Sequence, residues 1–299
     1  MRAVQPVWTT ELGSTYCTSI EEFIQSKAAN KLRGQVDLIF TSPPFPLVSP
    51  KAYGNRVGND YLTWIVEVTK CLVPLLRSTG SLVMEIGNAW EKGRPTMSTL
   101  PLRTLLAIEE STDLLVCQQF IWENSAKLPG PATWVNRDRI RVKDSHTNIW
   151  WFSPTPFPKA NNRRVLVPYS GAMKRLISSG KYNHGPRPSE HQISAKHFAK
   201  DNSGAIPGST LIMSNTSVSA SYRTWCQQNG LRMHPARMPS KIPEFFINFL
   251  TDPGDLVLDP FAGSNTTGAA AEHLGRRWLA IEREMEYVEG GIGRFEGSH

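Results

Sequence analysis

The chain has 299 residues, of which 40% are hydrophobic, 20% charged and 9% aromatic, which is typical of a globular protein and argues against a disordered one. No stretch approaches 18 apolar residues without a charge, and the first residues lack the apolar core of a signal peptide, so we expect a cytoplasmic protein. The net charge of +7 is concentrated in the middle of the chain: residues 123–242 hold 18 Lys and Arg side chains against five Asp and Glu. This bias favours contact with a polyanion over the alternative, a solvated lysine-rich loop region.

The order of the predicted elements indicates an α/β fold. In chain order we expect a strand at 36–40, a helix at 60–76, a strand at 80–87, a helix at 99–110, strands at 116–122 and 147–152, a helix at 241–250, a strand at 255–259, a helix at 264–274 and a strand at 278–282. Strands that alternate with helices predict a parallel sheet covered on both faces. From residue 153 to about 230 the frequent prolines, glycines and asparagines predict an irregular insert without a second core.

The four cysteines favour no metal site or disulfide framework. They lie far apart, at Cys17, Cys71, Cys117 and Cys226, and form no CxxC pair. The seven histidines likewise show no metal-ligand spacing, so we expect no metal.

A glycine-bearing turn near the C-terminus has the features of a cofactor loop. Residues 259–268 (DPFAGSNTTG) follow a predicted strand and open a helix, which is where α/β sheets bind ligands. Gly263 allows a tight turn, and the free N–H groups of the helix start favour an anion. Glu282 ends the next strand, where an acid can accept hydrogen bonds from the ribose of a nucleoside cofactor.

A second corner, Ser42-Pro43-Pro44-Phe45, follows the first predicted strand. The exocyclic amine of a nucleobase is a poor nucleophile because its lone pair is delocalised into the ring. Acceptors such as the Ser42 hydroxyl and the Pro43 carbonyl, fixed by proline geometry, would localise that pair, and Phe45 could stack on the base. Alone, this motif would be read as a turn that ends a strand; the downstream cofactor loop makes a catalytic role the better interpretation.

Together, these two motifs resemble those of the DNA amino-methyltransferases that use S-adenosylmethionine. The catalytic motif precedes the cofactor loop, as in the β group, and the serine is typical of members that act at N4 of cytosine. Three further stretches resemble the PvuII-type modification methyltransferases: residues 127–152, 187–207 and 234–246. The resemblance implies a seven-stranded, mostly parallel, Rossmann-like sheet with a loop-rich target-recognition insert, and a cytosine flipped out of double-stranded DNA.

The resemblance also assigns roles to residues and regions. The residues implied to be catalytic are Ser42, Pro43, Pro44, Phe45 and Glu85, the last accepting a hydrogen bond or a proton from the target amine where a relative has Asp. Those implied to bind the cofactor are Asp259, Pro260, Phe261, Gly263, Ser264, Asn265, Thr266 and Glu282. Residues 234–243 match a segment that covers the methionine end of the cofactor. The implied regions are a catalytic half (1–153), a DNA target-recognition region (154–230) and a cofactor-binding half (231–299).

The sequence departs from the family at one place. Cys17 and Thr18 stand where Gly-Asp is common, and an aspartate there would contact the adenine amine of the cofactor, so that contact is not predicted here. Glu85 also has an alternative interpretation as a purely structural cap.

The duplex contacts are predicted from the basic residues of the middle region. The candidates for phosphate or guanine contact are Arg137, Arg139, Arg141, Lys143, Arg163, Arg164 and Arg187. A restriction-modification setting with a cognate endonuclease, in a bacterial, archaeal or phage context, fits this family, and either a monomer or a homodimer is compatible with the sequence.

The sequence bears on four other functions. Methylation of adenine at N6 is the main alternative. Transfer to C5 of cytosine is disfavoured because no cysteine follows a proline. A DNA-binding protein without catalysis is disfavoured by the intact Ser42 and Glu282, and methylation of a protein amide by both the motif and its order.

Overall fold

The computed structural model describes residues 4–45, 56–180, 185–186, 192–193, 200–215 and 219–296. The chain forms two compact units. The larger comprises residues 1–160 and 209–299, and the smaller comprises residues 161–208.

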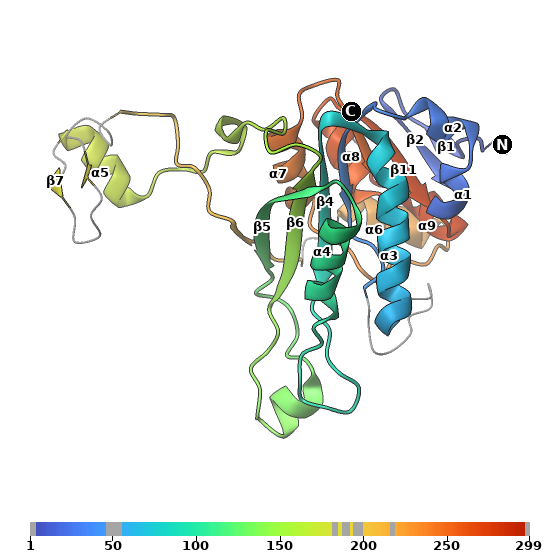
Figure 1. Ribbon diagram of the computed structural model, residues 1–299, viewed down its shortest axis with the longest axis horizontal. Coiled ribbons are helices and arrows are strands. Elements are labelled where there is room, and N and C mark those ends of the chain that lie inside the picture. Colours follow the sequence, from blue (N-terminus) through green and yellow to red (C-terminus); the bar gives the residue numbers. More distant parts are fainter. Residues whose placement is uncertain are drawn as a thin grey trace. The chain divides into compact units, whose positions relative to one another are not determined.

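In its described part, the larger unit is built on a single mixed sheet with the order β1-β2-β11-β10-β3-β4-β6-β5-β9 (Figure 1). The strands are β1 (Trp8–Thr9), β2 (Gly13–Cys17), β3 (Val36–Thr41), β4 (Leu76–Gly87), β5 (Leu115–Glu123), β6 (His146–Ser153), β9 (Thr210–Ile212), β10 (Leu256–Asp259) and β11 (Arg277–Glu282). From β2 to β4 along this order the neighbouring strands are parallel. β6 is antiparallel to both β4 and β5, and β1 is antiparallel to β2.

The expectation of a mostly parallel sheet of seven strands was wrong in detail. The sheet is mixed because the chain returns from β5 and inserts β6 between β5 and β4. It has nine strands because β1 and β9 extend its edges, with only two and three residues each. Strands this short carry too little apolar pattern to be seen in a sequence.

Helices cover both faces of the sheet. Those of the larger unit are α1 (Ile20–Ile24), α2 (Lys27–Lys31), α3 (Gly58–Leu72), α4 (Leu100–Ser111), α6 (Ala220–Gln228), α7 (Lys241–Leu250), α8 (Thr266–His273) and α9 (Met285–Ile292). Successive residues of a strand point to opposite faces, so Ile39 of β3 packs in the cluster that contains α1, α3 and α4, whereas Leu38 and Phe40 pack with α7 and α8. All six residues of β3 are buried, and the strand thus lies between two cores, as a sheet covered on both faces requires.

The predicted elements are present, with shifted ends. The helix predicted at 60–76 ends at Leu72, because Pro74 starts a 3-10 turn (Val73–Leu75) and Leu76 already belongs to β4. The helices and strands missed in the larger unit were β1, β2, α1, α2, β9, α6 and α9. Those missed in the smaller unit were α5 (Gly171–Ser179), β7 (Gly185–Pro186) and β8 (Gln192–Ile193). None of the helices in the described residues is both long and apolar enough to cross a membrane.

The smaller unit holds a 3-10 turn (Asn162–Val165), helix α5 (Gly171–Ser179) and the paired short strands β7 (Gly185–Pro186) and β8 (Gln192–Ile193). None of the buried hydrophobic residues identified in the described parts of the chain lies between 161 and 208. This agrees with the expected lack of a core in the insert, but the predicted insert was too long. Residues 209–230 belong to the larger unit, where β9 pairs with β5 and α6 contributes the buried Tyr222 and Cys226.

The connections leave the middle of the sheet in opposite directions. β3 leads through α3 to β4 on one side, and β10 leads through α8 to β11 on the other, while β3 and β10 pair with each other. In open α/β sheets, ligands bind outside the carboxyl ends of the strands at such a switch point. The fold therefore directs attention to the loops after Thr41 and Asp259.

Candidate active site

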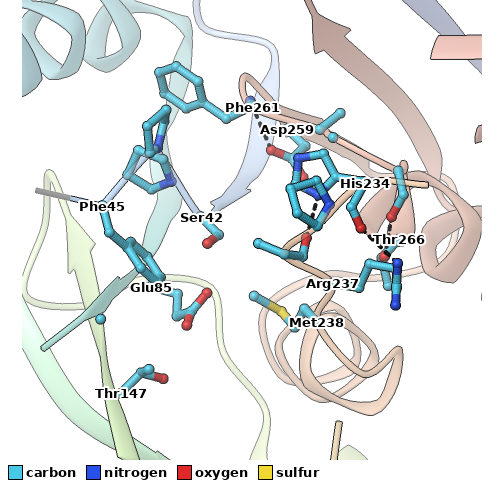
Figure 2. Close-up of a pocket in the computed structure, with 18 of the residues that line it drawn as sticks. Ser42, Phe45, Glu85, Thr147, His234, Arg237, Met238, Asp259, Phe261 and Thr266 are labelled. Atoms are coloured by element: carbon cyan, nitrogen blue, oxygen red, sulfur yellow. Dashed lines mark hydrogen bonds between the residues drawn. The ribbon is translucent and has the colours of Figure 1, made fainter. Parts of the chain in front are cut away.

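A cleft of about 560 Å³ opens at the carboxyl ends of β3, β4, β10 and β11, and every residue that lines it belongs to the larger unit. A volume of this size is typical of a small-molecule site. Figure 2 shows Ser42, Phe45 and Glu85 on one side of the cleft and His234, Arg237 and Thr266 on the other. The two predicted motifs, 218 residues apart at Thr41 and Asp259, thus face a common space.

The Ser42–Phe45 corner lies against the end of β4. Ser42 follows directly on β3, and Pro43 is buried. A Cβ atom on Gly87, the last residue of β4, would lie 2.6 Å from the Phe45 ring. The absence of a side chain at position 87 therefore lets this ring lie against the strand and form one wall of the cleft.

Glu85 is on β4, and only 4% of it is exposed. Burial raises the pKa of its carboxyl above the ordinary value, while the Ser42 and Thr147 hydroxyls and the Lys127 ammonium oppose this rise. Ser42, Glu85 and Thr147 lie near one another on the same side of the cleft (Figure 2). A buried acid in a cleft, with a raised pKa and hydroxyl neighbours, has the properties of a group that exchanges hydrogen bonds or protons with a ligand.

The polar wall beyond Glu85 was not predicted from the sequence. Lys127 donates to Asp144 over 2.9 Å, and the Asn88 amide donates to the other oxygen of Asp144 over 2.8 Å. Thr147 of β6 pairs with Gly87, so it shares a sheet face with Glu85. Lys127 and Thr147 both lie in the stretch that resembles relatives, which was the available signal; their position beside Glu85 depends on the antiparallel register of β4 and β6.

A buried carboxylate connects the two corners. Asp259 accepts hydrogen bonds from the Thr41 hydroxyl (3.0 Å), the Thr267 hydroxyl (2.6 Å) and the Phe261 amide (3.1 Å). Burial is the largest influence on this side chain and raises its pKa to about 6, although these three bonds act in the opposite direction. The side chain that was predicted to bind the cofactor thus also fixes the residue before Ser42.

Glu282, on the next strand, holds the glycine turn that was predicted to bind the cofactor. One carboxylate oxygen accepts from the Gly263 amide over 2.9 Å, and the other accepts from the Glu284 amide over 3.0 Å. Burial raises the pKa of Glu282, against the effect of these backbone bonds. Gly263 adopts φ +52°, a left-handed conformation that favours glycine, and a Cβ there would approach the His234 ring to 3.1 Å.

Arg294 supports the same turn through Ser264. Its guanidinium donates to the carbonyl (2.6 Å) and the hydroxyl (2.8 Å) of Ser264 and lies over the Tyr222 ring. The Tyr222 hydroxyl in turn accepts from the His234 amide over 2.9 Å. The His234 ring donates from Nδ1 to the Ala236 carbonyl and packs on Tyr287, and its burial lowers its pKa. The sequence had no signal for Arg294, which lies beyond the last helix.

Not every predicted cofactor residue faces the cleft. Pro260, Phe261, Gly263, Ser264 and Thr266 line it together with Asp259 and Glu282. Asn265 does not: it is 2% exposed, caps α8 by accepting from the Gly268 amide, and donates to Thr15. Thr18, where relatives often have Asp, lines the cleft, and its hydroxyl donates to Glu22.

The predicted duplex contacts are distributed over both units. Arg137, Arg139, Arg141 and Lys143 are exposed on the loop between β5 and β6, in the larger unit. Arg163 and Arg164 are in the 3-10 turn of the smaller unit, and Arg187 lies outside the described residues, as do His184, His191 and His197.

Comparison with known proteins decides the family. The model of the N6_N4_Mtase family, described as DNA methylase, matches residues 36–292. The chain is also 41% identical over 293 residues to the type II methyltransferase M.PvuII of Proteus hauseri, covering 97% of this chain and 86% of that protein. The chain belongs to the N6_N4_Mtase family of DNA methylases. The predicted resemblance is confirmed.

Solved structures agree with this membership. The methylase matches the structure titled PvuII DNA methyltransferase (cytosine-N4-specific) with a TM-score of 0.79 and 34% identity, over 99% of this chain and 90% of that one. It matches the M1.HpyAVI–SAM complex with a TM-score of 0.56 and 21% identity, over 95% of this chain and 100% of that one, which shows a shared fold.

Proposed function

We propose that this methylase transfers a methyl group from S-adenosylmethionine to the exocyclic N4 of a cytosine flipped out of double-stranded DNA. The observation that carries the proposal is the bond from Thr41 to Asp259, which holds the Ser-Pro-Pro-Phe corner and the glycine turn beside one cleft. The similarity to M.PvuII, whose structure is titled cytosine-N4-specific, supports cytosine as the target.

The cleft suits a nucleoside cofactor at the glycine turn. The Glu282 carboxylate is held by two backbone amides and keeps acceptor capacity for ribose hydroxyls. A Cβ at Gly263 would come within 3.1 Å of the His234 ring, so glycine lets His234 lie close to the turn, and both residues line the cleft. Phe261 and Trp64, whose ring centroids are 5.5 Å apart, add aromatic surface to the same cleft. When bound, S-adenosylmethionine supplies a methyl group activated on a sulfonium sulfur.

The opposite side of the cleft suits the amine of a base. The Ser42 hydroxyl and the Pro43 carbonyl accept hydrogen bonds from N4, which localises its lone pair, and Phe45 stacks on the ring. Glu85 accepts a further bond, or the proton that the amine loses when its nitrogen bonds to the methyl carbon. A weakly basic amine needs such a preset electrostatic environment more than it needs a strong base.

DNA recognition is proposed for the region 154–230 together with the loop that bears Arg137, Arg139, Arg141 and Lys143. Arg163, Arg164 and Arg187 complete the proposed phosphate and guanine contacts. M.PvuII is a type II methyltransferase, which favours a restriction-modification setting with a cognate endonuclease for this chain as well.

Product analysis tests the proposal. The purified protein is incubated with S-adenosylmethionine and genomic DNA, and the digested nucleosides are separated and weighed by mass spectrometry. We expect N4-methylcytosine and no N6-methyladenine. If the product is N6-methyladenine, the target is adenine, the main alternative, and not cytosine. If neither methylated base is formed, the proposed methyl transfer is refuted. Sequencing with modified-base detection then gives the target sequence.

A further inference from the structure

Leu128 stands at the mouth of the cleft with its side chain in solvent. It is 84% exposed, yet it lines the same cleft as Phe45 and Glu85. Its loop, residues 124–145, connects β5 to β6 and also carries the basic residues proposed to meet DNA. Single exposed leucines are common on protein surfaces, so exposure alone carries no argument. The argument rests on the position of this leucine at the rim of a pocket for a flipped base.

Contacts of neighbouring residues fix the position of the loop at Leu128. The preceding Lys127 donates to Asp144, which also accepts from Asn88 on the loop after β4. The backbone amide of Lys127 donates to the Asn124 carbonyl over 3.0 Å. Further along, Trp134 packs against Trp90 with ring centroids 5.9 Å apart. The backbone at Leu128 is thus fixed by contacts within its own loop and with the loop after β4. Its side chain, 84% exposed, contributes little to packing.

A base that leaves the duplex creates a gap that apolar side chains can fill. Extrusion costs the pairing and stacking energy of the base, and DNA-binding proteins offset such a cost by inserting Leu, Ile, Phe or Met between base steps. Of the three strongly exposed apolar residues on this loop, Leu128, Ile140 and Val142, Leu128 alone lines the cleft. Arg137, Arg139, Arg141 and Lys143 on the same loop supply positive charge for the phosphates on either side.

We propose that Leu128 enters the base stack of the duplex in place of the flipped cytosine. The inference rests on the proposed function, because it requires that a base leaves the helix and occupies the cleft. It makes Leu128 a positioning residue: it stabilises the open duplex and takes no part in the transfer of the methyl group.

The test compares Leu128→Ala with Leu106→Ala on two duplexes. Leu106 is 51% exposed on α4, does not line the cleft and lies outside the regions proposed to contact DNA, so the same substitution there is a matched control. One duplex has the target cytosine paired with guanine, and the other has an abasic site opposite it, so that most of the cost of extrusion is already removed. Both contain a target site found by modified-base sequencing, and kcat/KM is measured for each.

We expect Leu128→Ala to lower kcat/KM on the paired duplex roughly ten-fold or more and to recover to within about two-fold of the unchanged protein on the abasic duplex. Leu106→Ala should match the unchanged protein on both. A second readout uses 2-aminopurine at the target position without cofactor, whose fluorescence increase on binding should shrink in Leu128→Ala only.

Two results would overturn the inference. Equal activity of the two variants on the paired duplex would mean that Leu128 does not enter the stack. An equal loss on both duplexes would mean that it acts after extrusion. The proposed function fails in a different way, because then the unchanged protein transfers no methyl group to cytosine in either duplex.

Discussion

Replacing Asp259 by Asn should change the pH dependence of stability in a definite direction. The carboxyl of Asp259 is buried between the two corners of the site, and its pKa is raised to about 6 from an ordinary value of 3.8. Because the folded protein favours the protonated form, this group's contribution to stability is fully present below pH 3.8 and is lost as the pH rises through about 6. The shift corresponds to about 3 kcal/mol at 1.36 kcal/mol per pKa unit.

Asn should keep the fold because it resembles the protonated acid in shape. Its oxygen can accept from the Thr41 hydroxyl and the Phe261 amide, as one oxygen of Asp259 does, and its amide can donate to the Thr267 hydroxyl after that hydroxyl turns. The variant no longer carries a buried charge at neutral pH. Relative to the unchanged protein, its free energy of unfolding should therefore rise by about 2 to 3 kcal/mol between pH 4 and pH 7.

Urea unfolding at a series of pH values from 4 to 8 measures this difference. Asp113→Asn serves as the control, because Asp113 is exposed in the loop between α4 and β5, and its difference from the unchanged protein should stay within about 0.5 kcal/mol. If the difference in unfolding free energy between Asp259→Asn and the unchanged protein depends on pH as little as that of the control, ionisation of Asp259 does not destabilise the fold, and the reasoning is refuted.

Three further variants test separate parts of the site. Glu85→Gln should lower the single-turnover rate at least ten-fold and leave cofactor affinity by calorimetry unchanged, because an amide oxygen accepts a weaker hydrogen bond than a carboxylate and cannot take up the proton that the target amine loses. Gly87→Ala should displace the Phe45 ring and lower kcat/KM for DNA, again without loss of cofactor affinity. Arg294→Gln should weaken cofactor binding about ten-fold, because Ser264 loses charged hydrogen-bond donors worth about 1.5 to 3 kcal/mol. Arg294→Lys should recover part of this affinity. Unchanged affinity in Arg294→Gln would show that Arg294 does not support the loop.

The meeting of the two corners could be predicted because it follows from local patterns. Each motif directly follows an apolar run that becomes a parallel strand, and the carboxyl ends of parallel strands share one edge of the sheet. The same reasoning brought Glu282 to this edge, since β11 is parallel to β10. Family resemblance supplied the roles, which spacing alone does not specify.

The wall around Glu85 could not be predicted because it depends on long-range register. β6 follows β5 in the chain but pairs with β4 as well, and only that pairing sets Ile149 opposite Glu85 and Thr147 opposite Gly87. A shift by one residue would turn these side chains to the other face. Asn265 shows the opposite error: it matches the motif of a cofactor loop, but its side chain is used to cap α8.

The position of Asp259 gives a reason for a costly buried acid at the switch point. β3 and β10 are joined by backbone pairing at Ile39 and Leu258, but the pairing ends before the loops that form the site. Beyond that point the Asp259 carboxylate continues the connection, with Thr41 on one side and Phe261 and Thr267 on the other. The carboxylate accepts from all three groups as they stand, whereas an asparagine satisfies them only after the Thr267 hydroxyl has turned to accept from its amide. A side chain without two polar atoms would leave buried donors unpaired, at about 1 to 3 kcal/mol each. The acid therefore lowers the stability of the fold but fixes the spacing between two corners, the one proposed to hold the base and the one proposed to hold the methyl donor. Transfer of a group between two bound molecules requires such a fixed spacing.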